Sequence, residues 1–303
     1  MLKLVESFSL AGDPAKPNED AFGGSDQAAV VLDGATMLGD GLMPGPSDAA
    51  WIAQFGARRL IAHLKDWEPK KALKLALGDV EKSFGALRRA EPEEYWQVPV
   101  ASMMLFVEIQ ASLPLSAKRD KGEVAVAGSR VSEGRRGLEF LYFGDCGALV
   151  EQPDGLKIIG ETLDKRAEES ARAAALAKEK NISPASGLSR PEFIGHLRAA
   201  RNRVNNGGNW LFSPDKRAAT HAQRRLVAVE KGAYLLLATD GFLSLASDYG
   251  AYDAAGLLAA AKTKGLKALG DEIRAIENAD MLGDKFARFK KSDDATALLL
   301  TVE

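Results

Sequence analysis

Short apolar runs bounded by turn residues recur along the chain, and each predicts a strand. Residues 27–33 (QAAVVLD) predict a buried strand that ends at an acid followed by glycine, and residues 100–110 (VASMMLFVEIQ) predict a central strand. Residues 138–150 (LEFLYFGDCGALV) predict a strand, a sharp Gly-Asp turn and the start of the next strand. The next turn is predicted at PDG, residues 153–155, and the LKII segment after it predicts a further strand. This succession of strands and turns predicts an antiparallel meander.

The C-terminal half contains three more predicted strands. Residues 224–229 (RRLVAV) and 233–239 (AYLLLAT) predict two strands joined by an EKGA turn. Residues 295–302 (ATALLLTV) predict the last strand of the chain. Strands therefore occur in both halves of the sequence, with room for helices between them.

Helical periodicity fills several of the intervals. Residues 47–65 predict a helix with Ser47 or Asp48 as its N-cap and an apolar face. Residues 164–180 are charged and rich in alanine, which predicts a helix exposed on the rim. The other predicted helices cover residues 69–89, 190–204, 252–263 and 265–277.

The order of these elements predicts one α+β domain over residues 1–303. No fixed repeat and no clear interdomain linker divides the chain. Antiparallel sheets covered by helices are the architecture that such an order favours. A polar interval rich in Lys, Arg, Gly and Ser, at about 111–137, is predicted to be a long hairpin loop between two strands.

Composition narrows the classes of function. Lys+Arg 40 against Asp+Glu 42 leaves a formal charge of −2, so no basic field favours nucleic acid as a partner. One cysteine, Cys146, excludes an internal disulfide, and the three histidines lack the spacing of a zinc site. We expect Cys146 to be a small buried apolar side chain. The apolar runs are of strand length, so we expect a cytoplasmic protein with no signal peptide and no membrane span.

The distribution of acids carries the chemistry. Acids stand at strand ends or beside glycines at Glu19, Asp20, Asp33, Asp145, Asp240, Asp293 and Asp294. A buried carboxylate is costly unless it is paired, hydrogen-bonded or bound to metal. Mg²⁺ and Mn²⁺ prefer oxygen ligands and relieve the repulsion between such acids. The alternative is that each Asp-Gly pair is only a turn signal, and spacing alone does not decide between the two.

Five short motifs occur in an order that resembles the metal-dependent protein phosphatases of the PPM, or 2C, type. They are NEDA at 18–21, VLDGAT at 31–36, GDCGAL at 144–149, LLATDGF at 236–242 and SDDATALLL at 292–300. The resemblance spans almost the whole chain. It implies a four-layer αββα sandwich of two antiparallel β-sheets flanked by helices. It also implies hydrolysis of phosphoserine and phosphothreonine in proteins by a metal-activated water.

The resemblance also assigns roles to residues. Asp33 looks like the carboxylate that bridges two Mn²⁺ or Mg²⁺ ions, and the Gly34 carbonyl resembles a ligand of one of them. Asp33 and Asp240 are the catalytic positions, and Asp145 corresponds to an acid that supports a third ion in some members. The full set of implied metal positions is Glu19, Asp20, Asp33, Gly34, Asp145, Asp240 and Asp293.

The chain departs from the family pattern at several positions. Ala15 stands where the family usually has an arginine that clamps the substrate phosphate, so Lys16 becomes the candidate phosphate-binding residue unless another arginine reaches in. Ala35 stands where many members have a histidine, and Asp294 where asparagine is frequent. The interval at about 160–223 matches poorly and is expected to form a flap-like insertion.

These departures keep other functions open. One alternative is a non-catalytic pseudophosphatase, a binding module on the same fold. Another is a phosphatase of small phosphorylated metabolites. The arginines Arg198, Arg201 and Arg203 are interpreted as a solvated helix face, with attraction of phosphorylated peptides as the alternative. A phosphorylated protein is the expected partner, and the oligomeric state stays open.

Overall fold

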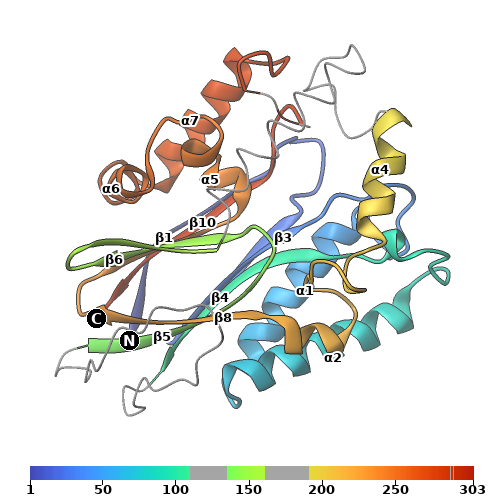
Figure 1. Ribbon diagram of the computed structural model, residues 1–303, viewed down its shortest axis with the longest axis horizontal. Helices are drawn as coiled ribbons and strands as arrows, with labels where there is room; N and C mark the ends of the chain where they lie inside the picture. Colours follow the sequence, from blue (N-terminus) through green and yellow to red (C-terminus); the bar gives the residue numbers. More distant parts are fainter. Residues whose placement is uncertain (110–134, 161–190, 287, 289) are drawn as a thin grey trace.

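Two five-stranded antiparallel sheets pack face to face in the computed structural model, which describes residues 1–109, 135–160, 191–286, 288 and 290–303 (Figure 1). The first sheet has the order β1 (Leu2–Leu10), β10 (Ala295–Val302), β9 (Tyr234–Ala238), β6 (Gly147–Gln152) and β7 (Gly155–Ile159). The second has the order β2 (Asp20–Gly24), β3 (Ala28–Gly34), β4 (Ala101–Ile109), β5 (Arg135–Phe143) and β8 (Gln223–Glu230).

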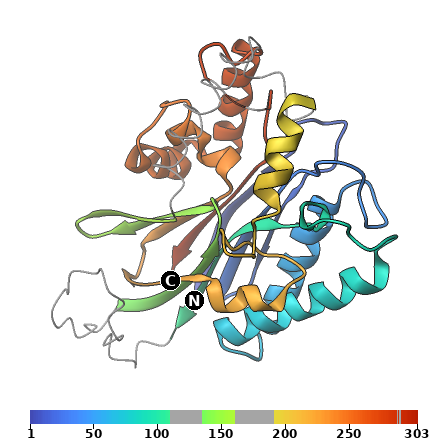
Figure 2. The ribbon, with the colours of Figure 1, turned by 45° about the vertical axis from the view of Figure 1, so that its right-hand side comes forward.

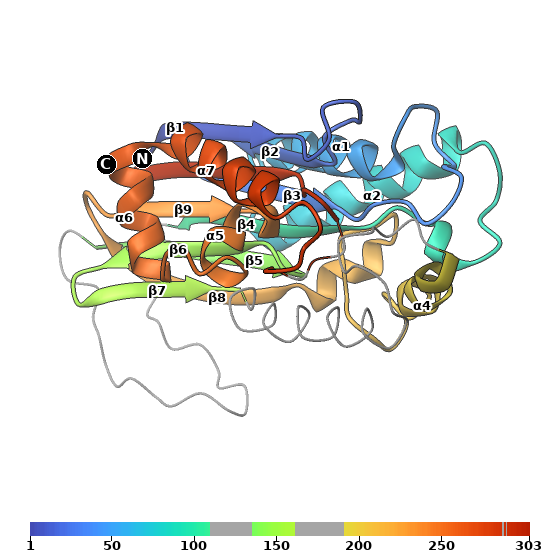
Figure 3. The ribbon, with the colours of Figure 1, turned by 90° about the horizontal axis from the view of Figure 1, so that it is seen from above.

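Helices cover the outer face of each sheet, so the predicted four-layer αββα sandwich is confirmed (Figures 1 and 3). The second sheet is covered by α1 (Asp48–His63) and α2 (Pro69–Leu87). The first sheet is covered by α5 (Asp240–Ser247), α6 (Ala254–Lys264) and α7 (Leu266–Ala279). Among the helices that the structure describes, none has the length and apolar character needed to cross a membrane.

The described residues form three further helices beside these layers. α4 (Pro191–Arg201), drawn in yellow, stands at the end of the sandwich away from the chain termini (Figures 1 and 2). The short 3₁₀ helices η1 (Tyr95–Gln97) and η3 (Lys216–His221) lie in the connections that follow α2 and precede β8. The two termini meet at the other end, where the Glu303 amide donates to the Met1 carbonyl at 2.8 Å.

The central strands bury both of their faces, which explains their nearly continuous apolar sequences. In β3, Ala29 and Val31 pack in the core between the two sheets, whereas Val30 and Leu32 pack against α1 and α2. This alternation is the period of two that a strand imposes on its side chains. The next residue on the face between the sheets is Asp33, so the strand itself directs that carboxylate between the sheets.

Most predicted elements agree with the structure to within a few residues, but β1, β2, α5 and the two 3₁₀ helices η1 and η3 were not predicted. β1 lies at the edge of its sheet and has no apolar run, and from Glu6 to Leu10 it alternates half-buried and exposed positions. β2 is only five residues long, and α5 begins directly at Asp240, where the sequence suggested only the end of a strand. β5 begins at Arg135, inside the predicted 111–137 loop. The rest of that loop and the predicted 164–180 helix lie outside the described residues.

A close contact fixes the segment after α4 against α1. Phe212 is fully buried and forms an isolated antiparallel bridge with Ala101 at the start of β4. A Cβ at Gly56, in the middle of α1, would lie 2.6 Å from Cε1 of the Phe212 ring. Trp210 and Leu211, the two residues before Phe212, lie against the same core.

We expect Gly56→Ala to destabilise the protein by about 1–3 kcal/mol, although alanine is the better helix former, because the buried Phe212 ring has no room to move. Gly78→Ala in α2 is the matched control, since a Cβ there meets nothing within 4 Å. It should stabilise by about 0.5–1 kcal/mol. Urea unfolding of both variants measures the difference, and equal effects of the two substitutions would contradict the packing argument.

Candidate metal centre

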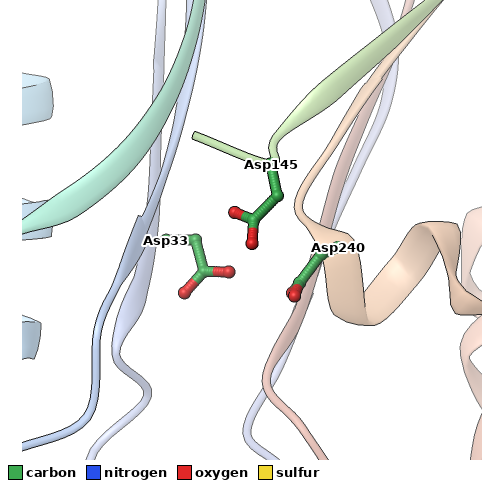
Figure 4. Close-up of side chains that lie close together, drawn as sticks. All are labelled: Asp33, Asp145 and Asp240. Carbon is green, nitrogen blue, oxygen red and sulfur yellow. The ribbon is translucent and has the colours of Figure 1, made fainter. Parts of the chain in front are cut away.

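Three carboxylates from separate parts of the chain converge at one end of the sandwich (Figure 4). Asp33 lies at the end of β3, Asp145 in the turn between β5 and β6, and Asp240 at the start of α5. One oxygen of each lies within 4.8 Å of the corresponding oxygens of the other two. The strand-end acids selected from the sequence are thus brought together by the pairing of strands that are distant in sequence.

The glycines beside these acids allow the backbone to approach closely. A Cβ at Gly241 would lie 1.9 Å from the Asp294 carbonyl oxygen, and one at Gly34 would lie 2.4 Å from the Ala49 carbonyl oxygen. Gly144 has φ +67°, a left-handed conformation that favours glycine, and a Cβ there would meet the Ser102 hydroxyl. Of these three pairs, Gly144-Asp145 forms a turn, whereas Asp33-Gly34 ends β3 and Asp240-Gly241 begins α5. The prediction of a turn is therefore wrong for the two Asp-Gly pairs, and their glycines serve the close approach of backbone segments beside the acids.

Asp20 and Asp33 lie directly opposite each other in the β2–β3 pairing, so both belong to the face between the sheets. Burial is the main cause that raises the pKa of each carboxyl well above its ordinary value, and the charges of neighbouring aspartates add to the effect. Asp20 Oδ2 accepts from the Thr239 hydroxyl at 2.8 Å. Its other oxygen, Oδ1, is buried and meets no hydrogen-bond donor among the described residues. Such an oxygen points to a cationic ligand.

Asp293 lies beside the three-acid cluster with its carboxylate turned towards a lysine. Its Oδ1 lies 2.8 Å from Nζ of Lys290. Its backbone carbonyl accepts from the Arg274 guanidinium at 2.7 Å, and Arg274 in turn pairs with the buried Glu277 at 2.6 Å. α7 therefore holds the segment that leads into β10, while the Asp293 side chain pairs with Lys290.

Glu19 is engaged by hydroxyl groups rather than by the three-acid cluster. Its Oε2 accepts from Thr36 Oγ1 at 2.6 Å and its Oε1 from Ser47 Oγ at 2.7 Å. The Glu19 carbonyl accepts from the Gly34 amide at 3.0 Å. The carboxylate thus holds the loop after β3 to Ser47, the N-cap residue of α1.

Asp294 has a role that sequence reasoning did not find. Its Oδ1 accepts from the Gly12 amide at 2.7 Å and its Oδ2 from the Glu19 amide at 2.6 Å. A carboxylate offers both acceptors, whereas the asparagine that is frequent at this position offers one. Asp294 therefore ties the segment before β2 to the start of β10, on the other sheet. No local sequence pattern predicts this contact, because the residues that it joins lie about 280 positions apart.

The candidate phosphate-binding lysine lies on an exposed turn. The Lys16 side chain is 76% exposed, and its Nζ lies 3.8 Å from Asp13 in the same turn. Arg201 of α4, by contrast, is largely buried and reaches the Thr36 carbonyl at 3.5 Å, near the charge of Glu19. It lines a small pocket together with Ala35 and Met37, directly after β3.

Other side chains that could do chemistry have structural partners. Cys146 is fully buried in the core between the sheets, as predicted. His63 lies 2.7 Å from Asp79 between α1 and α2, and His221 stacks on Trp210 at 3.6 Å between ring centres. Arg198 donates to the Leu38 carbonyl at 2.7 Å, so that residue is not the solvated cation that its sequence suggested.

Solved structures of other proteins share the fold of this chain, although its sequence has no close match. No protein-family profile and no curated protein matches the sequence. Three similar solved structures are the serine/threonine phosphatase PstP/Ppp of Mycobacterium tuberculosis (TM-score 0.54, 15% identity, covering 100% of this chain and 99% of that one), the PPM Ser-Thr phosphatase MsPP of Mycobacterium smegmatis (0.53, 13%, 99% and 99%) and the serine/threonine phosphatase Stp1 of Staphylococcus aureus (0.50, 15%, 99% and 96%).

The chain has the PPM phosphatase fold. The resemblance seen in the five motifs is confirmed at the level of architecture. Identities of 13–15% show the fold alone, because one fold hosts many functions and function depends on the site.

The donors present in this PPM fold suit hard divalent cations. Asp33, Asp145 and Asp240 offer carboxylate oxygens within 4.8 Å of one another, and Asp20 adds a buried oxygen without a donor. Mg²⁺ and Mn²⁺ take such oxygen ligands, whereas zinc sites are usually built from histidine and cysteine. A divalent cation would also offset the repulsion that raises the pKa of Asp20 and Asp33.

The Thr239 hydroxyl joins the two sheets beneath the acids, because it donates to Asp20 and accepts from the Thr296 amide at 3.0 Å. We expect Thr239→Val to destabilise the protein by about 1–3 kcal/mol, since the valine leaves two buried polar groups without partners. Thr301→Val is the control, because that hydroxyl makes one bond, of 3.3 Å, to the Ala233 carbonyl. Urea unfolding in EDTA compares them, and a smaller loss for Thr239→Val than for Thr301→Val would contradict this assignment.

Asp33→Asn should raise the thermal midpoint of the metal-free protein at neutral pH by a few degrees, on the order of 2–4 °C. The folded state raises the pKa of Asp33, so it binds more protons than the unfolded state, and wild-type stability in EDTA falls as pH rises above about 4. The amide removes that contribution, and the fall should become shallower. Added Mn²⁺ should stabilise wild type more than the variant.

Differential scanning fluorimetry from pH 5 to 8, with EDTA or Mn²⁺, measures both effects. Asp154→Asn, in the exposed turn between β6 and β7, is the control and should change neither the midpoint nor its pH dependence. A lower midpoint for Asp33→Asn in EDTA would contradict the burial of a repelled carboxylate at this position.

Proposed function

We propose that this chain is a metal-dependent phosphatase that hydrolyses phosphoserine and phosphothreonine in proteins. The observation that carries the proposal is the convergence of Asp33, Asp145 and Asp240 within 4.8 Å, at one end of the face between the two sheets of a PPM fold. The similar solved structures include serine/threonine phosphatases, which supports the same class of reaction.

The roles follow from where the acids stand. Asp33 at the end of β3 and Asp240 at the start of α5 are the proposed catalytic ligands, with Asp145, Asp20 and Asp293 completing the donor set. When bound, divalent ions supply a nucleophilic water near neutral pH and neutralise charge on the phosphate. The chain holds the ligands rigidly: Thr239 orients Asp20, and Arg274 anchors the backbone at Asp293.

The residues that meet the substrate phosphate differ from the family pattern. Ala15 brings no charge to the exposed turn, and Lys16 is directed to Asp13. Arg201 is the better-placed cation, because its side chain is largely buried beside the loop that follows Asp33. A guanidinium can bind a phosphate through two parallel hydrogen bonds, which a lysine cannot. We therefore assign the phosphate contact to Arg201 rather than Lys16.

A pseudophosphatase is the second candidate function, and the loss of the arginine at position 15 favours it. Such a protein would bind metal and a partner without turning over a phosphate ester. A phosphatase of small phosphorylated metabolites is the third candidate function. Substrate comparison at a fixed metal concentration separates these readings from the first.

We expect wild type to hydrolyse a phosphothreonine peptide with Mn²⁺ and to lose turnover in EDTA. Asp33→Ala should reduce turnover on the order of 10²–10³-fold or more, since it removes a ligand shared by the centre. Asp66→Ala, in the exposed turn after α1, is the matched control and should keep wild-type activity. Release of inorganic phosphate from the peptide and from a small chromogenic ester is measured in parallel.

The contrary outcomes point to the other candidates. Equal turnover by Asp33→Ala and wild type would exclude the proposed centre. Turnover of the small ester but not the peptide would favour a metabolite phosphatase. No turnover of either substrate by folded protein that binds Mn²⁺ would favour the pseudophosphatase.

A further inference from the structure

Lys290 places a positive charge against Asp293, one of the acids that the proposed function assigns to metal. It lies in the connection between α7 and β10, three residues before Asp293. Its Nζ lies 2.8 Å from Asp293 Oδ1, and the two side chains are 33% and 32% exposed. The ammonium is therefore partly withdrawn from water and in direct contact with a proposed ligand.

Acids from three parts of the chain act on this ammonium. Although burial alone would lower its pKa, the neighbouring charges raise the pKa of Lys290 above its ordinary value, and Asp293 contributes most, followed by Asp33 and Asp240. Asp33 and Asp240 belong to the three-acid cluster. The lysine thus interacts with the same carboxylates that a divalent ion would bind.

A lysine and a divalent cation cannot both make full use of the Asp293 carboxylate. A divalent ion that takes Asp293 Oδ1 as a ligand, at about 2.0–2.1 Å for Mg²⁺, competes with Lys290 Nζ for the negative charge of that oxygen. The Lys290 ammonium and the divalent ion would also repel each other, because both would contact the same carboxylate. Lys290 can leave because its stem is flexible and the residue lies outside a helix or strand.

We propose that Lys290 is the internal counter-ion of this centre, which occupies the Asp293 position until a divalent ion displaces it and which thereby weakens metal binding. The inference rests on the proposed metal centre. Lys290 has two effects with opposite signs. It stabilises the metal-free protein by neutralising repelled acids, and it raises the metal concentration that the protein needs.

The neighbouring Lys291 offers a matched control. It is exposed, and its contact with Arg288 is made by the backbone: the Lys291 carbonyl accepts from Arg288 Nε. Lys290→Gln and Lys291→Gln therefore make the same change of charge one residue apart. Lys290→Arg is a third variant that retains a positive charge at the site.

We expect Lys290→Gln to bind Mn²⁺ roughly tenfold more tightly than wild type, because an interaction with one unit charge near the acids is worth about one pKa unit or more. In EDTA its thermal midpoint should lie below that of wild type. Lys291→Gln should match wild type in both measurements, and Lys290→Arg should bind Mn²⁺ within about threefold of wild type. Isothermal titration of the full chain with Mn²⁺ and thermal melts in EDTA test these values.

Each contrary result has a separate meaning. Unchanged or weaker Mn²⁺ binding by Lys290→Gln, with wild type still binding the ion, would overturn the counter-ion role alone. A rise in KM for a phosphopeptide with an unchanged Mn²⁺ affinity would instead assign Lys290 to substrate binding. Tenfold tighter binding by Lys290→Arg would also overturn the proposal. No binding of Mn²⁺ by any variant or by wild type would overturn the metal centre itself.

Discussion

Repulsion between buried carboxylates is the constraint around which this end of the molecule is organised. Asp20 and Asp33 stand opposite each other on neighbouring strands, and like charges in that arrangement destabilise a sheet. Burial of both groups raises the pKa of each, and Asp240 adds a third charge from the start of α5. Holding several charged carboxylates together destabilises the folded protein unless a cation binds between them. The cluster is therefore the observation on which the proposed metal-dependent phosphatase rests.

The surrounding structure resists this repulsion with contacts that join the two sheets. Asp294 accepts from the amides of Gly12 and Glu19, and the Thr239 hydroxyl binds Asp20. Arg274, paired with the buried Glu277, anchors the backbone at Asp293. These bonds connect segments separated by up to about 280 residues, so the acids are held in place by tertiary contacts and not by one local motif.

Two cations have proposed roles at this end of the molecule. Lys290 contacts Asp293, and Arg201 reaches the loop after β3 from α4. An ammonium offsets the charge of the carboxylate that it contacts, whereas a guanidinium can bind a phosphate through two parallel hydrogen bonds. With alanine at position 15, the proposed contact with the substrate phosphate falls to Arg201, and the proposed competition with metal falls to Lys290.

The sequence alone determined most of the helices and strands, and it identified carboxylates as the metal ligands to expect. Apolar runs such as AYLLLAT predict buried strands because burial on both faces needs continuous apolar residues, and the period of two along β3 placed Asp33 on one definite face. β1 and β2 were not predicted because these edge strands lack such runs.

Only the tertiary structure decided which acids meet. Asp33, Asp145 and Asp240 converge, Glu19 accepts from hydroxyl groups, and Lys290 pairs with Asp293. Convergence depends on strand pairing and sheet packing between distant segments, which local spacing does not encode.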